Sequence, residues 1–371
     1  MGGFGVRVRC ESTCGVCGFV TKRELLPVIL VYLLPNTVFP TLDQYVMNWT
    51  HIIKEIARGK DGARDLPPDE ATRLYGALLD GQVGELESGA IAIALRMKGE
   101  SASELAAFLA AIDARMPAMA RPAGMPRPIV VPTYNGARRA ANLTPLLMLA
   151  LRELEVPVLA HGLQEDFGRV TSAQILMALD VPPAPSVGVA QGELSERGLS
   201  FLLTGLLLPG LAQQLNLRAR LGLRNCAHSL VKMLDPFGGG GVVLASATHP
   251  PYIESMRTLL CARRQRALLF RGCEGEPYAN PKRCPRIECI DENGVAGILF
   301  EAEGDSLRSL PDLPDEATAL GAARWIRQVL AGEAVLPGPL AKQLAACLLS
   351  SGASADLDAA GLRVAHRFRL H

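Results

Sequence analysis

The sequence predicts an α/β protein in which a small helical domain precedes a larger domain built on a mostly parallel sheet. Between residues 47 and 117, apolar residues recur at helical spacing, as with Ile52, Ile53 and Ile56, and no strand pattern interrupts them. Beyond a proline-rich stretch, short apolar runs alternate with helical patterns, which is the order of parallel strands joined by crossover helices. A length of 371 residues suits two such domains.

Composition narrows the classes of function. The chain is 49% hydrophobic and 20% charged with a net charge of +1, which excludes global disorder and an overall polycation. Its longest uncharged apolar run, residues 25–34, is shorter than the roughly 20 residues of a membrane span and lacks a secretory cleavage pattern. Nine cysteines without framework spacing suit reduced thiols. We therefore expect a cytoplasmic protein with no membrane partner.

The first 46 residues differ from the rest because they show no clear amphipathic period. Cys10, Cys14 and Cys17 have the spacing of iron–sulfur ligands. The helix-rich segment that follows does not suit the barrel that such ligands require, so chance spacing is the favoured interpretation. We predict that residues 1–46 are a start-site overcall or a disordered tail, and that Met47 is the natural start.

The helical domain, residues 47–117, is predicted to contain four helices. They are expected from Trp49 to a turn at residues 58–60, from Asp69 to Gly81, around residues 91–97, and over residues 103–115. Four prolines between residues 116 and 128 mark a linker, which we place at residues 118–128.

The α/β domain, residues 129–371, is predicted from alternating elements. Strands are expected at residues 129–131, 156–160, 200–203, 242–245, 267–270 and 298–302. Helices are expected at residues 141–153, 171–179, 211–221, 251–262, 315–331 and 338–350.

The corner after the first of these strands is a candidate anion site. Asn135-Gly136 predicts a tight turn, and the run from Ala137 predicts a helix start. Amides and the helix dipole favour an anion at such a strand–turn–helix corner. This one has a single glycine, a tyrosine at position 134, and arginines at positions 138 and 139.

Two glutamates and two histidines near predicted strands each allow two interpretations of their role. Glu274 and Glu276 follow the strand at 267–270, where they suit a solvated loop at least as well as a metal site. His161 and His228 suit either acid–base groups or hydrogen-bonded structural residues.

Basic residues form a more coherent set. Arg138 and Arg139 are expected to start one helix, Arg169 to precede another, and Arg218, Arg220, Arg224 and Lys232 to lie along a third. Arg263, Arg264, Arg266 and Arg271 flank a strand, and Lys282, Arg283 and Arg286 follow it. Several of these follow strands, at the edge where α/β proteins bind ligands. Guanidinium groups there suit phosphates, although each arginine alone is better explained as a solvated residue.

Longer motifs resemble a known family. DGQVGELESGAIAIALRMKGES (80–101), VPVLAHG (156–162), LRARLGLRN (217–225) and the loop at 271–286 resemble anthranilate phosphoribosyltransferase of glycosyltransferase family 3. PTYNGARR (132–139), HSLVK (228–232) and GEPYANPKRCP (275–285) resemble its YbiB-type branch. The resemblance covers Met47 to the C-terminus. It implies a small helical domain hinged to a large α/β domain, as in these transferases and nucleoside phosphorylases, and a homodimer formed through the helical domain.

The resemblance also implies that the donor and metal sites are degraded. The family's Gly-Thr-Gly-Gly-Asp corresponds to Pro132–Gly136, which keeps only Thr133, and its magnesium-holding Asp-Glu pair falls on Pro277 and Tyr278. Arg218 matches the arginine that contacts the anthranilate carboxylate. The remnant positions of the phosphoribosyl pyrophosphate site are Thr133, Asn135, Gly136, Asn142, Thr144, His161 and Gly162.

These residues favour a homodimer that binds DNA, with RNA as a second candidate, on a transferase scaffold, as the resemblance to YbiB-type proteins also implies. The expected nucleic-acid contacts are Arg138, Arg139, Arg169, Arg218, Arg220, Arg224, Lys232, Lys282 and Arg283. Tyr134 and Tyr278 are candidates to stack on unpaired bases. No catalytic residue, metal or cofactor is expected. The first alternative is a phosphoribosyltransferase or phosphorylase with an altered acceptor, kept open by Asn142, Thr144, His161 and Arg218, and only that alternative requires Mg²⁺. A third interpretation, an interaction module that uses its dimer surface, has nothing in the sequence for or against it.

Overall fold

The computed structural model describes residues 48–59, 61–166, 168–303, 313–314 and 317–370. The predictions made for residues 1–46, including the start at Met47, lie outside these ranges. Residues 48–371 form one compact unit, which contains both the helical segment and the sheet. Within the described ranges, no helix is long and apolar enough to cross a membrane.

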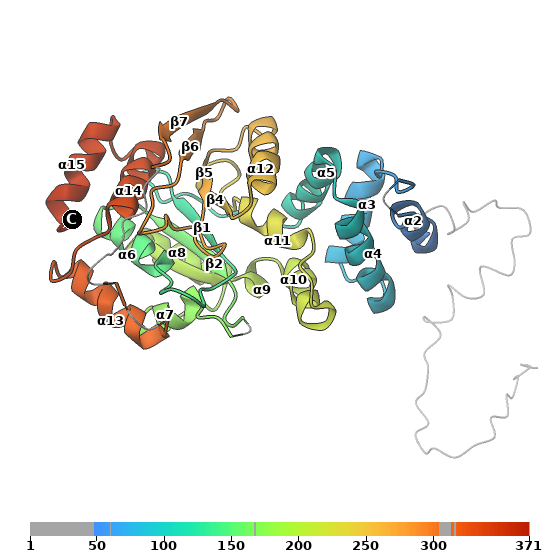
Figure 1. The fold of residues 1–371 in the computed structure, drawn as a ribbon, viewed down its shortest axis with the longest axis horizontal. Coiled ribbons are helices and arrows are strands. Elements are labelled where there is room, and N and C mark those ends of the chain that lie inside the picture. The colour runs from blue at the N-terminus through green and yellow to red at the C-terminus, as the bar shows by residue number, and fades with distance from the viewer. Residues whose placement is uncertain (1–47, 60, 167, 304–312, 315–316, 371) are drawn as a thin grey trace, which may run out of the picture. The chain divides into compact units, whose positions relative to one another are not determined.

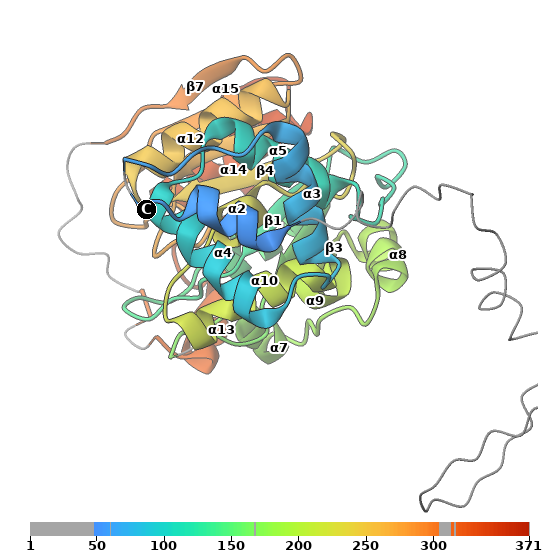
Figure 2. The same ribbon diagram turned by 90° about the vertical axis from the view of Figure 1, so that its right-hand side faces the viewer.

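Among the described residues, four helices form the N-terminal bundle, at the blue end of the chain in Figure 1. They are α2 (Trp49–Ile56), α3 (Pro68–Leu79), α4 (Glu85–Lys98) and α5 (Ala102–Asp113). Ser101 and Glu104 form a capping box that starts α5, and the buried Glu104 carboxylate also accepts from the Leu66 amide at 3.0 Å and the Lys98 ammonium at 2.6 Å. In Figure 2, α2 and α4 face the viewer.

In the described part of the chain, seven strands form one sheet in the order β3-β2-β1-β4-β5-β6-β7. The strands are β1 (Ile129–Thr133), β2 (Val158–Gly162), β3 (Leu199–Leu203), β4 (Val242–Ala247), β5 (Ala267–Arg271), β6 (Ile287–Ile290) and β7 (Ala296–Phe300). From β3 to β5 all pairs are parallel, whereas β6 and β7 add antiparallel pairs. The predicted mostly parallel sheet is confirmed.

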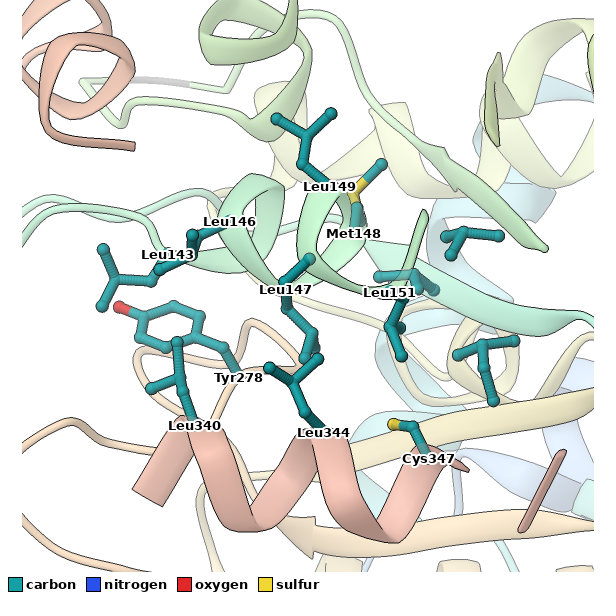
Figure 3. Close-up of a cluster of buried hydrophobic side chains, with 14 of the residues drawn as sticks. Leu143, Leu146, Leu147, Met148, Leu149, Leu151, Tyr278, Leu340, Leu344 and Cys347 are labelled. Carbon is teal, nitrogen blue, oxygen red and sulfur yellow. The ribbon is translucent and has the colours of Figure 1, made fainter. Parts of the chain in front are cut away.

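The remaining helices connect and cover the strands. They are α6 (Thr144–Glu153), α7 (Ser172–Ala178), α8 (Val187–Arg197), α9 (Thr204–Leu207), α10 (Pro209–Leu221), α11 (Ala227–Leu230), the 3₁₀ turn η2 (Val231–Met233), α12 (Pro250–Ala262), α13 (Ala319–Leu330), α14 (Gly338–Ser351) and α15 (Leu357–Arg367). The main core includes the apolar faces of α6 and α14, which Figure 3 shows packed against each other. Burial of these aliphatic side chains is the main source of stability.

The helical bundle packs closely on α10. A Cβ at Gly210 would lie 1.9 Å from the Leu79 carbonyl oxygen, so only glycine permits this approach of α10 to the end of α3. The Arg96 guanidinium on α4 donates to the Arg224 carbonyl at 2.8 Å. The proline-rich segment 118–128 is anchored as well, because the Met119 amide donates to the Pro236 carbonyl at 2.9 Å.

Several predicted elements need correction. The helix expected from Ala137 begins only at Thr144, and the antiparallel strand β6 and helices α8 and α15 were not expected. Two glycines, Gly188 and Gly192, weaken the helical pattern of α8, which Ser186 caps by accepting from the Val189 amide. The last strand lies at Ala296–Phe300, two residues earlier than expected, and α13 starts at Ala319, behind its Thr318 cap.

Candidate functional site

Two loops meet at the carboxyl edge of the parallel strands. One follows β1 and contains Tyr134, Asn135 and Gly136, and the other follows β5 and covers residues 272–280. Asn135 donates its side-chain amide to the Gly275 carbonyl at 2.8 Å. Gly275 has φ +90°, and a Cβ there would lie 2.7 Å from Asn135 Nδ2. The second loop is therefore fitted against the first.

The Glu276 carboxylate fills the turn after β1. One oxygen accepts from the amides of Asn135 at 2.6 Å and Gly136 at 2.8 Å. The other accepts from the hydroxyls of Thr133, Thr144 at 3.2 Å and Ser172 at 3.5 Å. Glu276 is fully buried. The amides that the sequence assigned to an anion thus already have one, supplied from a residue about 140 positions away in the chain.

The Glu274 carboxylate caps the next part of the same loop. It accepts from the amides of Arg138 at 3.2 Å, Arg139 at 2.9 Å and Ala140 at 3.2 Å. The Arg169 guanidinium lies 3.6 Å from it. Glu274 and Glu276 are therefore neither solvated loop residues nor paired metal ligands, because both point into the backbone amides of the loop after β1.

These contacts explain why no helix starts at Ala137. The amides of residues 138–140 are turned toward Glu274, so Arg138 and Arg139 belong to a loop and not to a first helical turn. The Asn142 side chain accepts from the Thr144 amide at 3.1 Å, and Pro145 follows in the first turn of α6. Asn142 also donates to the Ser172 hydroxyl at 3.1 Å, which links it to the Glu276 network.

Lys232 is buried and does not reach the surface. It lies in η2, and Arg224 lies in the loop after α10, so both residues are beyond the end of that helix. The prediction that one helix carries Arg218, Arg220, Arg224 and Lys232 is therefore wrong. Its ammonium donates to the carbonyls of Ser246 at 3.0 Å and Gly275 at 2.9 Å. Burial lowers its pKa to about 8, an effect that nearby Glu276 partly opposes. Lys232 supports the 272–280 loop and is not available to a nucleic-acid backbone.

The two tyrosines are also buried. Tyr134 is 3% exposed and its hydroxyl contacts Nδ1 of His161, while the Thr204 hydroxyl donates to it at 3.0 Å. Tyr278 is 0% exposed, and Figure 3 shows its ring between Leu143 and Leu340 in the core. Its hydroxyl donates to the Ala141 carbonyl at 3.1 Å. Stacking of either ring on a base is therefore excluded in this conformation.

Each of the two histidines contacts one polar side chain, and burial lowers the pKa of both. His161 is 0% exposed, and burial lowers its pKa to about 3. The Thr204 hydroxyl has one proton and lies 3.0 Å from both the Tyr134 hydroxyl and the Gly162 carbonyl oxygen, and Nε2 of His161 has no partner among the described residues. His228 lies 3.3 Å from the Asn225 side-chain oxygen, and burial together with Arg224 and Arg218 lowers its pKa to about 3.

A pocket of about 310 Å³ lies beside this group, lined in part by Tyr134, Asp166, Arg218 and His228. Arg218, which the resemblance assigns to an acceptor carboxylate, is paired with Asp166 at 3.1 Å. Arg224 has no carboxylate within 4.0 Å among the described residues, and burial, Arg218 and Arg169 all lower its pKa. Arg220 points elsewhere and pairs with Glu85 on α4 at 2.8 Å.

A second group of cations lies in the loop after β1, at the end of β5 and in the segment between β5 and β6. We call it the basic rim, and it consists of Arg138, Arg139, Arg271, Lys282 and Arg283. All five are exposed, and none forms an ion pair with a described residue. Arg139, Arg271 and Arg283 line a cavity of about 780 Å³ together with Glu274. Four of these five were predicted from the sequence as nucleic-acid contacts, and Arg271 was named only in the wider basic set, as a residue that flanks a strand.

The residues do not fit a catalytic magnesium site. The positions that the resemblance gives to the metal-holding pair are Pro277 and the buried Tyr278, whose hydroxyl is already hydrogen bonded. The neighbouring Glu276 carboxylate is saturated by amides and hydroxyls. Throughout the described part of the chain, no three His, Cys, Asp or Glu side chains form a group that could hold a metal ion.

Comparisons with known proteins agree with this architecture. Residues 50–116 match the helical bundle domain of the glycosyl transferase family. The chain is 42% identical to YbiB of Escherichia coli (strain K12) over 87% of its own length and 100% of that protein. It is 27% identical to anthranilate phosphoribosyltransferase of Myxococcus xanthus (strain DK1622) over 82% of this chain and 91% of that one.

Solved structures show the same fold. Anthranilate phosphoribosyltransferase from Thermus thermophilus superposes with a TM-score of 0.68 at 21% identity, covering 85% of this chain and 94% of the other. The Saccharomyces cerevisiae enzyme in complex with PRPP and Mg gives 0.66 at 12% identity, covering 86% and 93%. The chain therefore belongs to the YbiB branch of the anthranilate phosphoribosyltransferase-like proteins of glycosyltransferase family 3.

Proposed function

We propose that this protein binds nucleic acid through the basic rim. The observation that carries the proposal is that five exposed cations converge on one edge of the sheet without carboxylate partners, although Glu274 and Glu276 lie beside them. Both carboxylates accept from backbone amides, and neither forms an ion pair with Arg138, Arg139, Arg271, Lys282 or Arg283. Unpaired guanidinium and ammonium groups at this density suit a phosphate backbone.

Binding of this kind positions a backbone without reading bases. Phosphate contacts carry no sequence information, and the buried Tyr134 and Tyr278 cannot supply base stacking. We therefore expect weak sequence preference, strong salt dependence and binding of DNA, with RNA as a second ligand through the same phosphate contacts. Arg218 on the wall of the 310 Å³ pocket extends the positive field together with the neighbouring Arg169 and Arg224, although Asp166 neutralises part of it.

An electrophoretic mobility shift assay with several unrelated single- and double-stranded DNAs tests this proposal. We expect shifts of comparable affinity for unrelated sequences at low salt. A substituted protein, Arg324→Glu with Arg369→Glu, is a matched control, because both arginines are exposed, unpaired among described residues and outside both cavities. No shift at low salt with any DNA would contradict the proposal.

We also propose that the protein is a homodimer formed through its helical bundle. Leu86 is 81% exposed and Met97 74% exposed, and both line an apolar hollow of about 1150 Å³ on α2 and α4 together with Ile53 and Ile93. Exposed large apolar side chains gathered on one face favour a protein partner. A second copy of the chain is the occupant that the resemblance to the dimeric transferases implies.

Light scattering after size exclusion tests the dimer. Leu86→Asp with Met97→Asp is expected to yield a monomer, because two carboxylates would be buried in the apolar interface. Leu320→Asp with Leu362→Asp is the matched control, since those leucines are each 72% exposed and lie on α13 and α15. A wild-type monomer, or a dimer that survives the first pair of changes, would contradict this interface.

The alternative is a phosphoribosyltransferase with an altered acceptor. The 310 Å³ pocket with Arg218 on its wall favours it, whereas Glu276 in the turn and the absence of carboxylates at positions 277 and 278 oppose it. Only this alternative would require Mg²⁺. Calorimetric titration with phosphoribosyl pyrophosphate and Mg²⁺ tests it, and no heat at millimolar ligand would rule it out.

The cytoplasm is the compartment we propose for this activity. The six cysteines in the described part of the chain are free thiols, which suits a reducing environment.

A further inference from the structure

We propose that Glu276 is an internal substitute for phosphate, which closes the anion site of the loop after β1, and that removing this side chain opens a site for inorganic phosphate. The inference is independent of nucleic-acid binding, because it concerns backbone amides and hydroxyls inside the fold and none of the basic rim.

The donors around Glu276 are those of an oxyanion site. Two consecutive backbone amides, from Asn135 and Gly136, converge on one oxygen, and three hydroxyls from three different segments converge on the other. Successive amides in a turn form a concave site that suits anions, and phosphate offers more acceptor oxygens than a carboxylate. The buried Lys232 ammonium adds a positive charge nearby.

Backbone hydrogen bonds within its own loop hold Glu276 in place. The Glu276 amide donates to the Cys273 carbonyl at 2.9 Å, and the Cys273 amide donates back to the Glu276 carbonyl at 3.2 Å. A Cβ at Gly272 would lie 2.3 Å from the Glu276 carbonyl oxygen, so the turn is closed tightly around this residue. Withdrawal of the side chain would require this turn to open. In the folded wild-type protein, the site is therefore filled.

Glu274 extends the same arrangement further along the loop. Its carboxylate accepts from the amides of residues 138–140. The two glutamates together accept from five of the six amides of residues 135–140, and the remaining amide, that of Ala137, donates to the Val170 carbonyl at 3.0 Å. Removing Glu276 alone is therefore expected to admit one phosphate group, whereas pyrophosphate is expected to gain affinity only when Glu274 is removed as well.

The test is a titration of three full-length proteins, wild type, Glu276→Ala and Glu276→Gln, with inorganic phosphate. Thermal melts and calorimetry measure the response, and sodium chloride of matched ionic strength is the control. Glu276→Ala empties the site, and Glu276→Gln keeps it filled with a side chain of the same shape. We expect at least a tenfold tighter binding of phosphate to Glu276→Ala than to wild type, with a saturable rise in melting temperature. Wild type and Glu276→Gln should respond to phosphate no more than to chloride.

Two results would overturn the proposal. One is phosphate binding by wild type as tight as that by Glu276→Ala, and the other is a Glu276→Ala protein whose melt does not depend on phosphate. If Glu276→Ala is insoluble, the smaller polar change Glu276→Ser and refolding in phosphate or in chloride replace the melts. Recovery of folded protein in phosphate alone is then expected, and equal recovery in both salts would contradict the assignment.

Discussion

The loop after β1 contains two regions with opposite properties. At Asn135 and Gly136, the backbone donors are buried and satisfied by Glu276. Two residues later, Arg138 and Arg139 project exposed side chains that pair with no described carboxylate, even though their own amides bind Glu274. The backbone amides of this loop donate to carboxylates of the protein itself, whereas its two arginine side chains have no carboxylate partner among the described residues.

The difference follows from the cost of burial. A buried amide without a partner loses the full energy of its solvation, so the fold has to supply an acceptor where no ligand does. An exposed guanidinium keeps its water and needs no partner. The same edge of the sheet can therefore lose a phosphate cradle and keep a positive surface.

The largest expected effect concerns the region in which Glu276 accepts from the buried amides of Asn135 and Gly136. Glu276→Ala leaves two amides and the hydroxyls of Thr133 and Thr144 without their acceptor, which we expect to lower the free energy of unfolding by about 3–5 kcal/mol. Arg138→Glu with Arg139→Glu should change it by less than about 0.5 kcal/mol, because both side chains are exposed. Urea unfolding followed by circular dichroism measures both. Equal losses would mean that the two regions do not differ as we describe.

The next effect concerns the exposed region. Arg138→Glu with Arg139→Glu is expected to weaken binding to a fixed DNA duplex by about 10- to 100-fold, since two phosphate contacts are lost and two repulsive charges are added. Fluorescence anisotropy at one low salt concentration measures the change, beside the Arg324→Glu, Arg369→Glu control. If the control weakens binding equally, net charge and not the basic rim is responsible.

The pH dependence of the unfolding free energy tests whether the buried His161 stays unprotonated in the folded protein. The folded-state pKa of His161 is about 3, below its ordinary value of 6.5, so the unfolded chain takes up a proton that the folded chain refuses. Its contribution to stability is complete above pH 6.5 and is lost as the pH falls toward 3, at up to about 1.4 kcal/mol per pH unit. His161→Asn should flatten the plot of unfolding free energy against pH in this window, and an unchanged slope would show that the histidine is not excluded from protonation.

The smallest expected effect is that of the Tyr134 hydroxyl, which we expect to contribute to stability and not to DNA affinity. Tyr134→Phe removes the hydroxyl that accepts from Thr204 and contacts His161, at a cost of about 1 kcal/mol in stability. Since the ring is buried, DNA affinity should stay within about twofold of wild type. A larger loss of affinity, measured by anisotropy, would indicate that the ring becomes exposed and stacks on a base.

Much of the fold follows from sequence patterns. The order of buried strands and crossover helices predicted a mostly parallel sheet, because periods of apolar residues report which faces are buried. The antiparallel β6 was missed, since Ile287–Ile290 is short and follows a proline-rich loop. The start of α6 was misplaced because the amides of residues 138–140 bind Glu274, a partner that local sequence does not reveal.

The site was less predictable for the same reason. Thr133, Asn142 and Thr144 were found as remnants of a phosphate site, but the acceptor that Thr133 and Thr144 now contact is Glu276, from another loop. Sequence reasoning treated that glutamate as solvated or metal-binding. Lys232 and the two tyrosines were expected at the surface, because a polar residue in a loop gives no local sign of tertiary burial.

The salt dependence of DNA binding tests the central claim most directly. We expect the logarithm of the association constant to fall linearly with the logarithm of salt concentration, with a slope of about −4 if most of the five rim cations each neutralise one phosphate. Arg138→Glu with Arg139→Glu should reduce the magnitude of that slope by about 2. A flat line for wild type, or the same slope in both proteins, would contradict the proposal that the basic rim binds a nucleic-acid backbone.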